Sequence, residues 1–528
     1  MASVEDIYLF RHAVYRDVAY ELQLPSERSQ LHTAAISIAE QFFTNELHLV
    51  AAELATHAHL AQQGASAELL DQLAQTEFKY LLMQLEHEFQ RAQWQTVTDI
   101  AAHARTCAGY NEAKHGKVCQ MQARALENMG RRLEAESTWL EIAEHGKEVN
   151  NSEDVVAGLC GAGLCRIVLG RHDEATEVFA SAKAYAGGNT ALRAQVLMDM
   201  SMLSNNQGDF AEHERLLFEA LQLIGDADSK LKTGIRGNIA NMYANTNRRP
   251  KAIRELVKLL AEFEEFGDTR GVATANANLG RQLMLEGDFE QAIGHLERAI
   301  ELATEIGIQR SVAFALANLA EIKLRTGDLD TGRVSAEQAC ALADEQGLPL
   351  YHAAYTCTLA MSHLLVGHEI LANELVENAR AEFVSVHGES FIAEYCNPVR
   401  LRIAASQAVS MPVPGRKTSR LKATKPSPSW LPVMEAMLRE LEQSRDQRGP
   451  TANPQLIEAI ETGHALLAEL RAAIAEKRPA LVFRGYRPAE LSHEVRSALV
   501  QRMTEHETHL LHKLHPALWS ALAGQGQQ

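Results

Sequence analysis

Three asparagines recur at one spacing in the middle of the chain, at Asn238, Asn278 and Asn318, each 40 residues after the last. A side-chain amide offers donors and an acceptor, so it can pair with both the N–H and C=O groups of an extended peptide. Alternatively, each amide bonds the backbone of a neighbouring helix. The flanking equivalents are Asp199 and Thr358. Three residues after the asparagines and Thr358, the side chains change from polar to apolar along the chain, in the order Asn241, Arg281, Glu321 and Met361.

No catalytic or cofactor motif stands out elsewhere. A G-x-x-x-x-G-K-[ST] phosphate loop is absent, because HGKV (115–118) lacks the hydroxyl and the first glycine, and PGRKTS (414–419) lacks the spacing. The glycine-rich GLCGAGLC (158–165) lies in a helical pattern with no strand before it, which predicts close helix packing. We therefore predict no enzyme activity and no cofactor.

Four histidines near the C-terminus stand three residues apart, at His506, His509, His512 and His515. They could present two metal ligands on one face of a helix. The H-E-x-x-H spacing is not met, and a solvated helix face is the alternative. We predict no metal site.

Composition excludes several classes of protein. The formal net charge of the 528 residues is −17, which disfavours binding to nucleic acid because phosphate would be repelled. The seven cysteines are odd in number and form no C-x-x-C pair, so we expect reduced thiols. The longest uncharged apolar run, 155–165, is far shorter than the roughly 20 residues that span a membrane. We expect a cytoplasmic protein that binds no membrane.

Small residues repeat at the same 40-residue interval as the asparagines, and they predict the elements that position them. Gly287 would end a first helix, and Asp288 would cap a second one. Two small-residue breaks in each unit are typical of stacked helical hairpins. The repeating sets are Gly280, Ala320 and Ala360; Gly287, Gly327 and Gly367; Ala299, Ala339 and Ala379; and Gly267, Gly307 and Gly347.

The unit TANANLGRQLMLEGDFEQAIGHLERAIELATEIG (274–307) closely resembles the tetratricopeptide repeat, although 40 residues exceed its usual length of about 34. The resemblance implies an all-α fold, a solenoid or superhelix of hairpins whose first helices line the concave face. Drifted copies predict about nine hairpins over residues 47–405.

The segment YLFRHAVYRDVAYELQLPSERSQLHTAAISIAE (8–40) resembles the end of the winged helix and the start of the repeats in bacterial STAND-type regulatory ATPases. The matching residues are Phe10, His12, Ala19, Tyr20, Leu31, His32 and Ala39. Residues 1–46 would then be a remnant winged-helix-like cap, and Met1 would fall after the nucleotide domain. The chain would correspond to the sensor half of such a protein.

The C-terminal part breaks the repeat pattern. Residues 406–429 hold four prolines and five Lys or Arg without an acidic residue, which predicts a basic linker. Helical stripes resume in residues 430–528, and we expect a small helical module there that caps the array or mediates self-association.

These patterns favour a non-catalytic scaffold or sensor that holds a peptide or protein segment in the concave groove of the repeats, in bacterial signal transduction or transcription control. The residues predicted to form this groove are Asn238, Asn241, Asn278, Arg281, Asn318 and Glu321. The expected partners are a protein or peptide ligand and an ATPase or kinase encoded nearby. Two alternatives remain open. A compact apolar pocket would favour a small-molecule sensor, and clustered titratable residues in a C-terminal cleft would favour an enzyme.

Overall fold

The computed structural model describes most of the chain, namely residues 18, 20–44, 46–91, 93–225, 229–387, 392–409, 426, 428–449 and 454–524. Regular structure in these residues is helical, apart from one isolated bridge between Phe483 and Tyr486. The predicted all-α fold is confirmed. Phe10, His12 and Ala19 of the expected winged-helix motif lie outside the described residues, as does most of the expected linker, 410–425 and 427.

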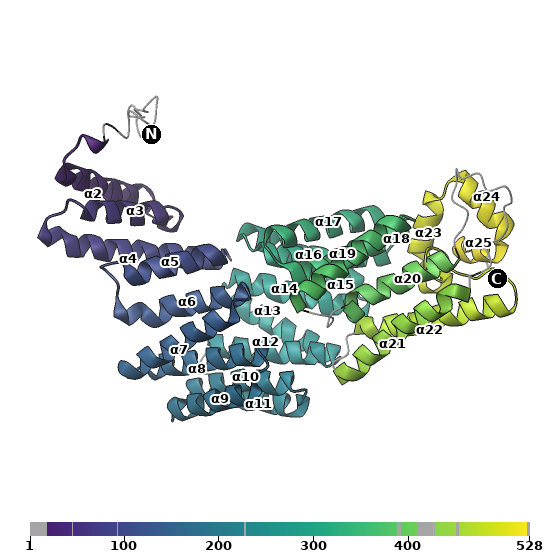
Figure 1. Ribbon diagram of the computed structural model, residues 1–528, viewed down its shortest axis with the longest axis horizontal. Helices are drawn as coiled ribbons and strands as arrows, with labels where there is room; N and C mark the ends of the chain where they lie inside the picture. Colours follow the sequence, from purple (N-terminus) through teal and green to yellow (C-terminus); the bar gives the residue numbers. More distant parts are fainter. Residues whose placement is uncertain are drawn as a thin grey trace. The chain divides into compact units, whose positions relative to one another are not determined.

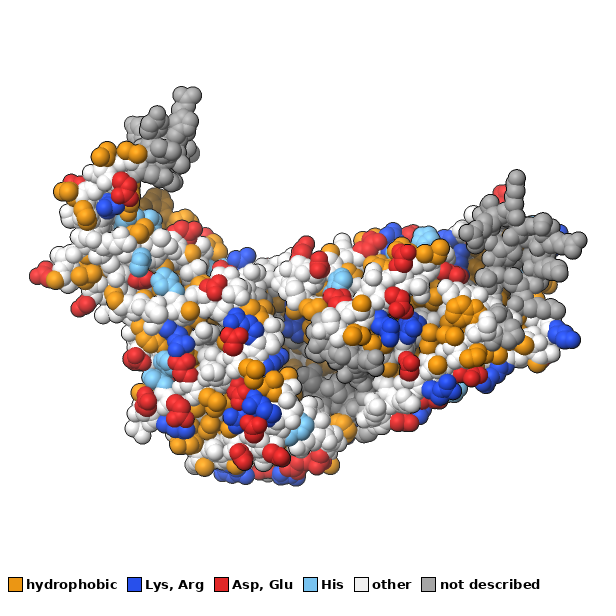
Figure 2. Space-filling view, viewed as in Figure 1, with side chains coloured by type: hydrophobic (Ala, Val, Ile, Leu, Met, Phe, Trp, Pro, Cys, Tyr) orange, Lys and Arg blue, Asp and Glu red, His pale blue; other side chains and the backbone are white. Residues whose placement is uncertain are grey.

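The chain divides into two units, Met1–Ile235 and Arg236–Gln528, and each is described by itself. In the first unit, successive helices pack on one another (Figure 1). Histidine side chains gather over its first helices on the face drawn in Figure 2. The helices are α2 (Pro25–Phe42), η1 (Leu47–Leu49), α3 (Ala51–Gln62), α4 (Ala67–Gln90), α5 (Trp94–Thr106), η2 (Glu112–Lys114), α6 (His115–Asn128), α7 (Arg132–Glu148), α8 (Ser152–Val168), α9 (His172–Ala186), α10 (Thr190–Asn206) and α11 (Phe210–Ile224).

The second unit begins within α12 (Ser229–Asn245) and contains the clearest hairpins. Its further helices are α13 (Arg249–Glu265), α14 (Thr269–Glu286), α15 (Phe289–Glu305), α16 (Gln309–Arg325), α17 (Leu329–Glu345), α18 (Pro349–Leu365), α19 (Glu369–His387), η3 (Ile392–Cys396), α20 (Asn397–Ala408), η4 (Pro428–Trp430), α21 (Leu431–Arg448), α22 (Pro454–Ala475), η6 (Pro488–Glu490), α23 (His493–Arg502), α24 (Glu505–Leu514) and α25 (Pro516–Leu522). In the described part of the chain, no helix has the length and apolarity to cross a bilayer.

The turn inside each hairpin follows the predicted chemistry. Gly287 ends α14 with a left-handed φ of 86°, which glycine adopts without a Cβ penalty. The Asp288 side chain then accepts a hydrogen bond from the backbone N–H of Gln291, at 3.2 Å, and caps α15. The predicted helix end and helix cap are both confirmed.

Complementary side-chain sizes set how closely the two helices of a hairpin approach. A Cβ atom on Gly280 of α14 would stand only 2.6 Å from Cγ of Leu296 on α15. One repeat later the same pair of positions holds Ala320 and Ala336, and two repeats later Ala360 and Val376. Leu296, Ala336 and Val376 are all fully buried. The largest of the three residues on the second helices, Leu296, is therefore the one that faces a glycine on the first helix.

The glycine-rich segment in the first unit forms the middle of α8 and confirms the prediction of close helix packing. A Cβ on Gly158 would lie 2.5 Å from the carbonyl oxygen of Trp139 on α7, and one on Gly161 would lie 2.2 Å from its ring. Glycine is required here because the backbone of α8 lies against α7.

The C-terminal segment packs on the last hairpins of its own unit. Phe483, Tyr486 and Val495 belong to the same buried apolar cluster as Ala360 and Leu364 of α18. Arg325 is the last residue of α16, and its carbonyl oxygen accepts a hydrogen bond from the Ser492 hydroxyl at 3.2 Å. The Arg484 guanidinium donates to the carbonyl oxygen of Leu365 at 2.8 Å. The segment thus satisfies carbonyl groups that the ends of two repeat helices leave open.

We predict that Gly280→Ala destabilises the protein by about 1–3 kcal/mol, because its methyl group overlaps Leu296. In a Leu296→Ala background the same change should cost much less, because only the contact of the new Cβ with the carbonyl oxygen of Ala292, at 3.1 Å, remains and alanine favours the helix more than glycine does. The measurement is the urea midpoint of the circular dichroism signal for all four members of the cycle.

Gly294→Ala is the matched control on α15, because a Cβ there meets no atom within 4 Å. It should raise stability by about 0.5–1 kcal/mol. An equal loss from Gly280→Ala with and without Leu296 would contradict the proposed size complementarity.

Candidate functional site

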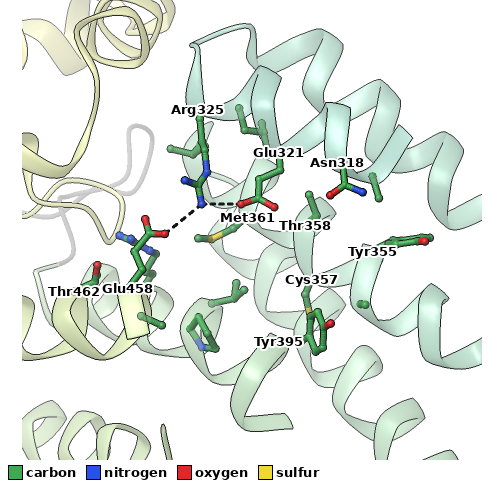
Figure 3. Close-up of a pocket in the computed structure, with 18 of the residues that line it drawn as sticks. Asn318, Glu321, Arg325, Tyr355, Cys357, Thr358, Met361, Tyr395, Glu458 and Thr462 are labelled. Atoms are coloured by element: carbon green, nitrogen blue, oxygen red, sulfur yellow. Dashed lines mark hydrogen bonds and ion pairs between the residues drawn. The ribbon is translucent and has the colours of Figure 1, made fainter. Parts of the chain in front are cut away.

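A cavity of about 630 Å³ lies within the second unit. The first helices of three hairpins, α14, α16 and α18, supply residues along one wall, and η3, α20, α22 and the segment around η6 supply the rest (Figure 3). The repeat accounts for the first wall, because corresponding helices present corresponding positions to the same side. The other wall comes from segments outside the repeat.

A cation between two carboxylates connects the two walls. The Arg325 guanidinium lies 2.7 Å from Oε1 of Glu321 on its own helix and 3.3 Å from Oε2 of Glu458 on α22 (Figure 3). The negative charge of Glu321, joined by that of Glu458, raises the pKa of Arg325 above its ordinary value. Arg325 therefore remains positive and holds α22 against α16.

Arg281 on α14 also lines the cavity and, unlike Arg325, is not paired with a carboxylate of the described residues. It makes no ion pair with any described residue of the chain, and its guanidinium carbon lies 6.0 Å from the ring centre of Phe314. A half-buried guanidinium without a carboxylate partner can bind an anionic group through two parallel hydrogen bonds.

Aromatic and thioether side chains cover the inner part of the cavity. Tyr355 and Met361 come from α18, and Tyr395 comes from η3 (Figure 3). Burial raises the pKa of Tyr355 well above its ordinary range, so its phenol remains a neutral hydrogen-bond donor. Such a surface favours the apolar part of a ligand, with few fixed polar groups to orient it.

The segment around η6 lines one side of the cavity through Tyr486. Its hydroxyl lies 3.2 Å from the sulfur of Met361, and the Arg402 guanidinium stacks 4.0 Å from its ring centre. Arg402 also pairs with Glu490 at 3.0 Å, and both of these side chains are largely buried. The position of the segment is thus fixed by a buried cation, a carboxylate and a ring, which act together.

The structure brings together three of the six residues predicted to form a groove. Arg281, Asn318 and Glu321 line the cavity, and Asn238, Asn241 and Asn278 do not. Asn318 is only 8% exposed, and its amide donates to the carbonyl oxygen of Phe314 one turn earlier in its own helix, at 2.7 Å. One of its two N–H groups is therefore used for structure.

Sequence reasoning missed the aromatic residues and the contribution of the C-terminal segment. Tyr355 and Tyr395 stand 40 residues apart, so the periodicity carried a signal for them that the glycine, alanine and asparagine sets did not include, whereas Glu458 belongs to no repeating set. Thr358 and Met361 were identified through the repeat, and both line the cavity. Among the described residues that line the cavity there is no histidine.

Residues 271–345, which form α14 to α17, match the family model of the tetratricopeptide repeat. The match and the helical hairpins together define the class of this part of the chain: residues 271–345 are tetratricopeptide repeats. The resemblance of the repeated units to the tetratricopeptide repeat is confirmed. No curated protein matches the sequence.

Several solved structures are similar to parts of the chain. BtubC from P. vanneervenii is 22% identical over 49% of this chain and 98% of its own, with a TM-score of 0.35. A Rap protein in complex with Competence and Sporulation Factor is 14% identical over 69% of this chain and 99% of its own, with a TM-score of 0.43. A STAND protein with a tetratricopeptide repeat sensor from Pyrococcus horikoshii is 14% identical over 86% and 74%, with a TM-score of 0.41. All three scores are below 0.5, so the class rests on the family match and the fold.

Asp199, a flanking equivalent of the asparagines, is a buried carboxyl group of the first unit. Its side chain is 6% exposed and accepts a hydrogen bond from Nε2 of Gln195 at 2.6 Å. Burial raises its pKa to about 6, although the hydrogen bonds from Gln195 and Cys160 act in the opposite direction. The folded protein therefore binds a proton at Asp199 more tightly than the unfolded chain does.

We predict that Asp199→Asn makes the protein more stable than the wild type at neutral pH, by about 2–3 kcal/mol. Because the folded pKa is raised, the contribution of Asp199 is complete below its unfolded pKa of about 4 and is lost as pH rises through about 6. The stability difference should therefore grow between these two pH values.

Urea midpoints measured across this pH range provide the test. The control is Asp71→Asn, a change at an exposed carboxylate of the same unit. A constant difference between Asp199→Asn and the wild type at all pH values would contradict the prediction.

Proposed function

We propose that this chain is a non-catalytic sensor or scaffold that binds a short peptide or protein segment carrying an acidic group. The observation that supports this most directly is Arg281, a cation without a carboxylate partner in the described residues, on the wall of a cavity rich in aromatic side chains. Its guanidinium would bind a carboxylate, and Tyr355 and Met361 would cover the apolar side chain beside it.

The ligand segment would continue from the cavity along the first helices. Asn278 lies on α14, the helix that carries Arg281, and Asn238 and Asn241 lie on α12 of the preceding hairpin. Their amides would pair with the backbone of an extended chain, while the cavity would select its acidic and apolar residues. In this arrangement the asparagines would contribute affinity through the ligand backbone, and the residues that line the cavity would contribute specificity.

A small molecule with a carboxylate is the second candidate, and the size of the cavity favours it. The volume of about 630 Å³ lies among the values of about 300–1,000 Å³ that are typical of small-ligand sites. The segment around Tyr486 covers one side of the cavity, as it would in a sensor that encloses its ligand.

We further propose that binding is read out in bacterial signal transduction or transcription control, in the cytoplasm, through an ATPase or kinase encoded nearby. The support is the resemblance of residues 8–40 to the segment that precedes the repeats in STAND-type ATPases. The ligand-binding proposal does not depend on this context.

We predict that peptides selected by the full chain from a random displayed library carry an acidic residue. The Arg281→Ala variant should bind these peptides about 10–100-fold more weakly than the wild type does. The loss corresponds to one charged hydrogen-bonded contact of about 1.5–3 kcal/mol. Isothermal titration calorimetry with the selected peptides measures it. Arg298→Ala, which removes an exposed arginine of α15, is the control and should leave affinity unchanged.

Selected peptides that bind Arg281→Ala as tightly as the wild type would contradict the assigned site. If no peptide is recovered and a carboxylate metabolite raises the thermal midpoint of the wild type, the small-molecule candidate is correct. That increase should also disappear in Arg281→Ala.

We predict different consequences for two of the repeated asparagines. Asn278→Ala should weaken binding of the selected peptides several-fold and leave the melting temperature unchanged. Asn318→Ala should lower stability by about 1 kcal/mol, because the side chain is buried and hydrogen-bonded to its own helix. Calorimetry and thermal melts of both variants make the comparison. Unchanged affinity with a lower melting temperature for Asn278→Ala would assign that residue to structure instead.

A further inference from the structure

Two histidines and a glutamate from three successive helices of the first unit meet at one point. His59 lies on α3, Glu77 on α4 and His103 on α5, within the part of the unit where Figure 2 shows histidines gathered. The Glu77 side chain is 2% exposed, while those of His59 and His103 are 55% and 49% exposed. A buried carboxylate thus lies beneath two imidazoles that solvent can reach.

The donor atoms have the spacing of a metal site. Oε1 of Glu77 lies 3.0 Å from Nδ1 of His59 and 3.2 Å from Nε2 of His103, and all three atoms lie within 4.8 Å of one another. Neighbouring ligands of a tetrahedral zinc ion, at about 2.0–2.1 Å from the metal, are separated by about 3.3 Å. The two nitrogens therefore converge on one oxygen with nearly the separations that a shared zinc ion requires.

The other carboxylate oxygen is already held in place. Nε2 of Gln62 donates to Oε2 of Glu77 at 2.6 Å and also contacts the carbonyl oxygen of Ala58, at 3.2 Å. This amide fixes the orientation of the carboxylate and leaves Oε1 directed at the two imidazoles. Hydrogen bonding to the second atom of a ligand is the usual support of a protein metal site.

The charge of the cluster also favours a cation. Among the described residues, the side chains bonded to Glu77 are those of His59, Gln62 and His103, and none is a lysine or arginine. A buried carboxylate requires a compensating positive charge, and no lysine or arginine supplies one here. A divalent ion would supply it.

A second cluster, around His115 on α6, is a weaker candidate. The Tyr110 hydroxyl is bonded to Nδ1 of His115 at 2.8 Å, and Glu141 is paired with the guanidinium of Arg105. The cation already present would repel a metal ion, and one ring nitrogen is already in use. The cluster centred on Glu77 has neither feature.

We propose that His59, Glu77 and His103 form a binding site for a divalent transition-metal ion, with zinc expected from the nitrogen and oxygen ligands. The ion joins α3, α4 and α5, and its fourth position faces solvent between the two exposed imidazoles. Its role is to stabilise the first hairpins of the array.

The test uses the full chain, treated with chelator and dialysed, and titrated with zinc chloride in a calorimeter. We expect one tightly bound ion per chain and a rise in the thermal midpoint. Glu77→Gln, which keeps the shape of the side chain, should abolish the tightest phase and the rise. Gln62→Ala should weaken binding by about 10–100-fold, as loss of an orienting partner does.

His464→Asn is the matched control. His464 is 57% exposed and pairs with one carboxylate, Glu442, at 2.9 Å, so it resembles His59 without the second imidazole. It should bind zinc like the wild type. Should Glu77→Gln fail to fold, as judged by circular dichroism, His103→Asn replaces it, because that side chain is half exposed.

Cobalt(II) binding can be followed by visible absorption in the wild type, without any variant. Binding of cobalt at this site should produce visible absorption of a low-coordinate nitrogen and oxygen set, and zinc should displace it. The proposal is overturned if the wild type shows no saturable binding at micromolar zinc, or if Glu77→Gln and His103→Asn retain the tightest phase.

Discussion

The closeness of the two helices in each hairpin is the constraint on which the rest of the second unit depends. The backbone of α14 approaches α15 so nearly that the Leu296 side chain occupies the space of a missing Cβ at Gly280. The packing of α15 against α14 therefore fixes which face of α14 points away from it. Arg281 follows Gly280 directly, so the same contact that closes the hairpin directs this guanidinium to the cavity wall. Gly280 thus contributes both to the packing of the hairpin and to the position of Arg281 in the candidate site.

Features that depend on neighbouring residues could be predicted from the sequence. Gly287 ends α14 through its backbone conformation, and Asp288 caps α15 through its side chain. Glycines at the same 40-residue spacing predict further helix ends. The cavity is a different case. The contact between Tyr486 and Met361 joins residues 125 positions apart, and Tyr486 lies in a segment that follows no repeat. Nothing local in either residue indicates the other.

Periodicity marks equivalent positions without specifying their surroundings. Asn318 recurs with Asn278 at a spacing of 40, yet Asn318 donates to its own helix. The most buried asparagine on α14 is Asn276, 3% exposed and bonded to His295 at 2.8 Å, and it belongs to no repeating set. The reason is that burial at a position depends on the size of side chains on the neighbouring helices, which vary from repeat to repeat. A repeated residue can thus be structural in one hairpin and accessible in the next.

The two units differ in the contacts that stabilise the hairpins at their ends. In a repeat array each hairpin is stabilised mainly by its neighbours, so hairpins with weak repeat character need other contacts. At the end of the second unit those contacts are apolar and charged groups of the C-terminal segment, such as Val495 and Arg484. Among the first helices of the first unit they include a carboxylate, Glu77, buried between two imidazoles. Apolar contacts persist under most solution conditions, whereas a buried charge depends on whatever cation accompanies it. The first hairpins are therefore where stability can respond to the ionic surroundings of the protein.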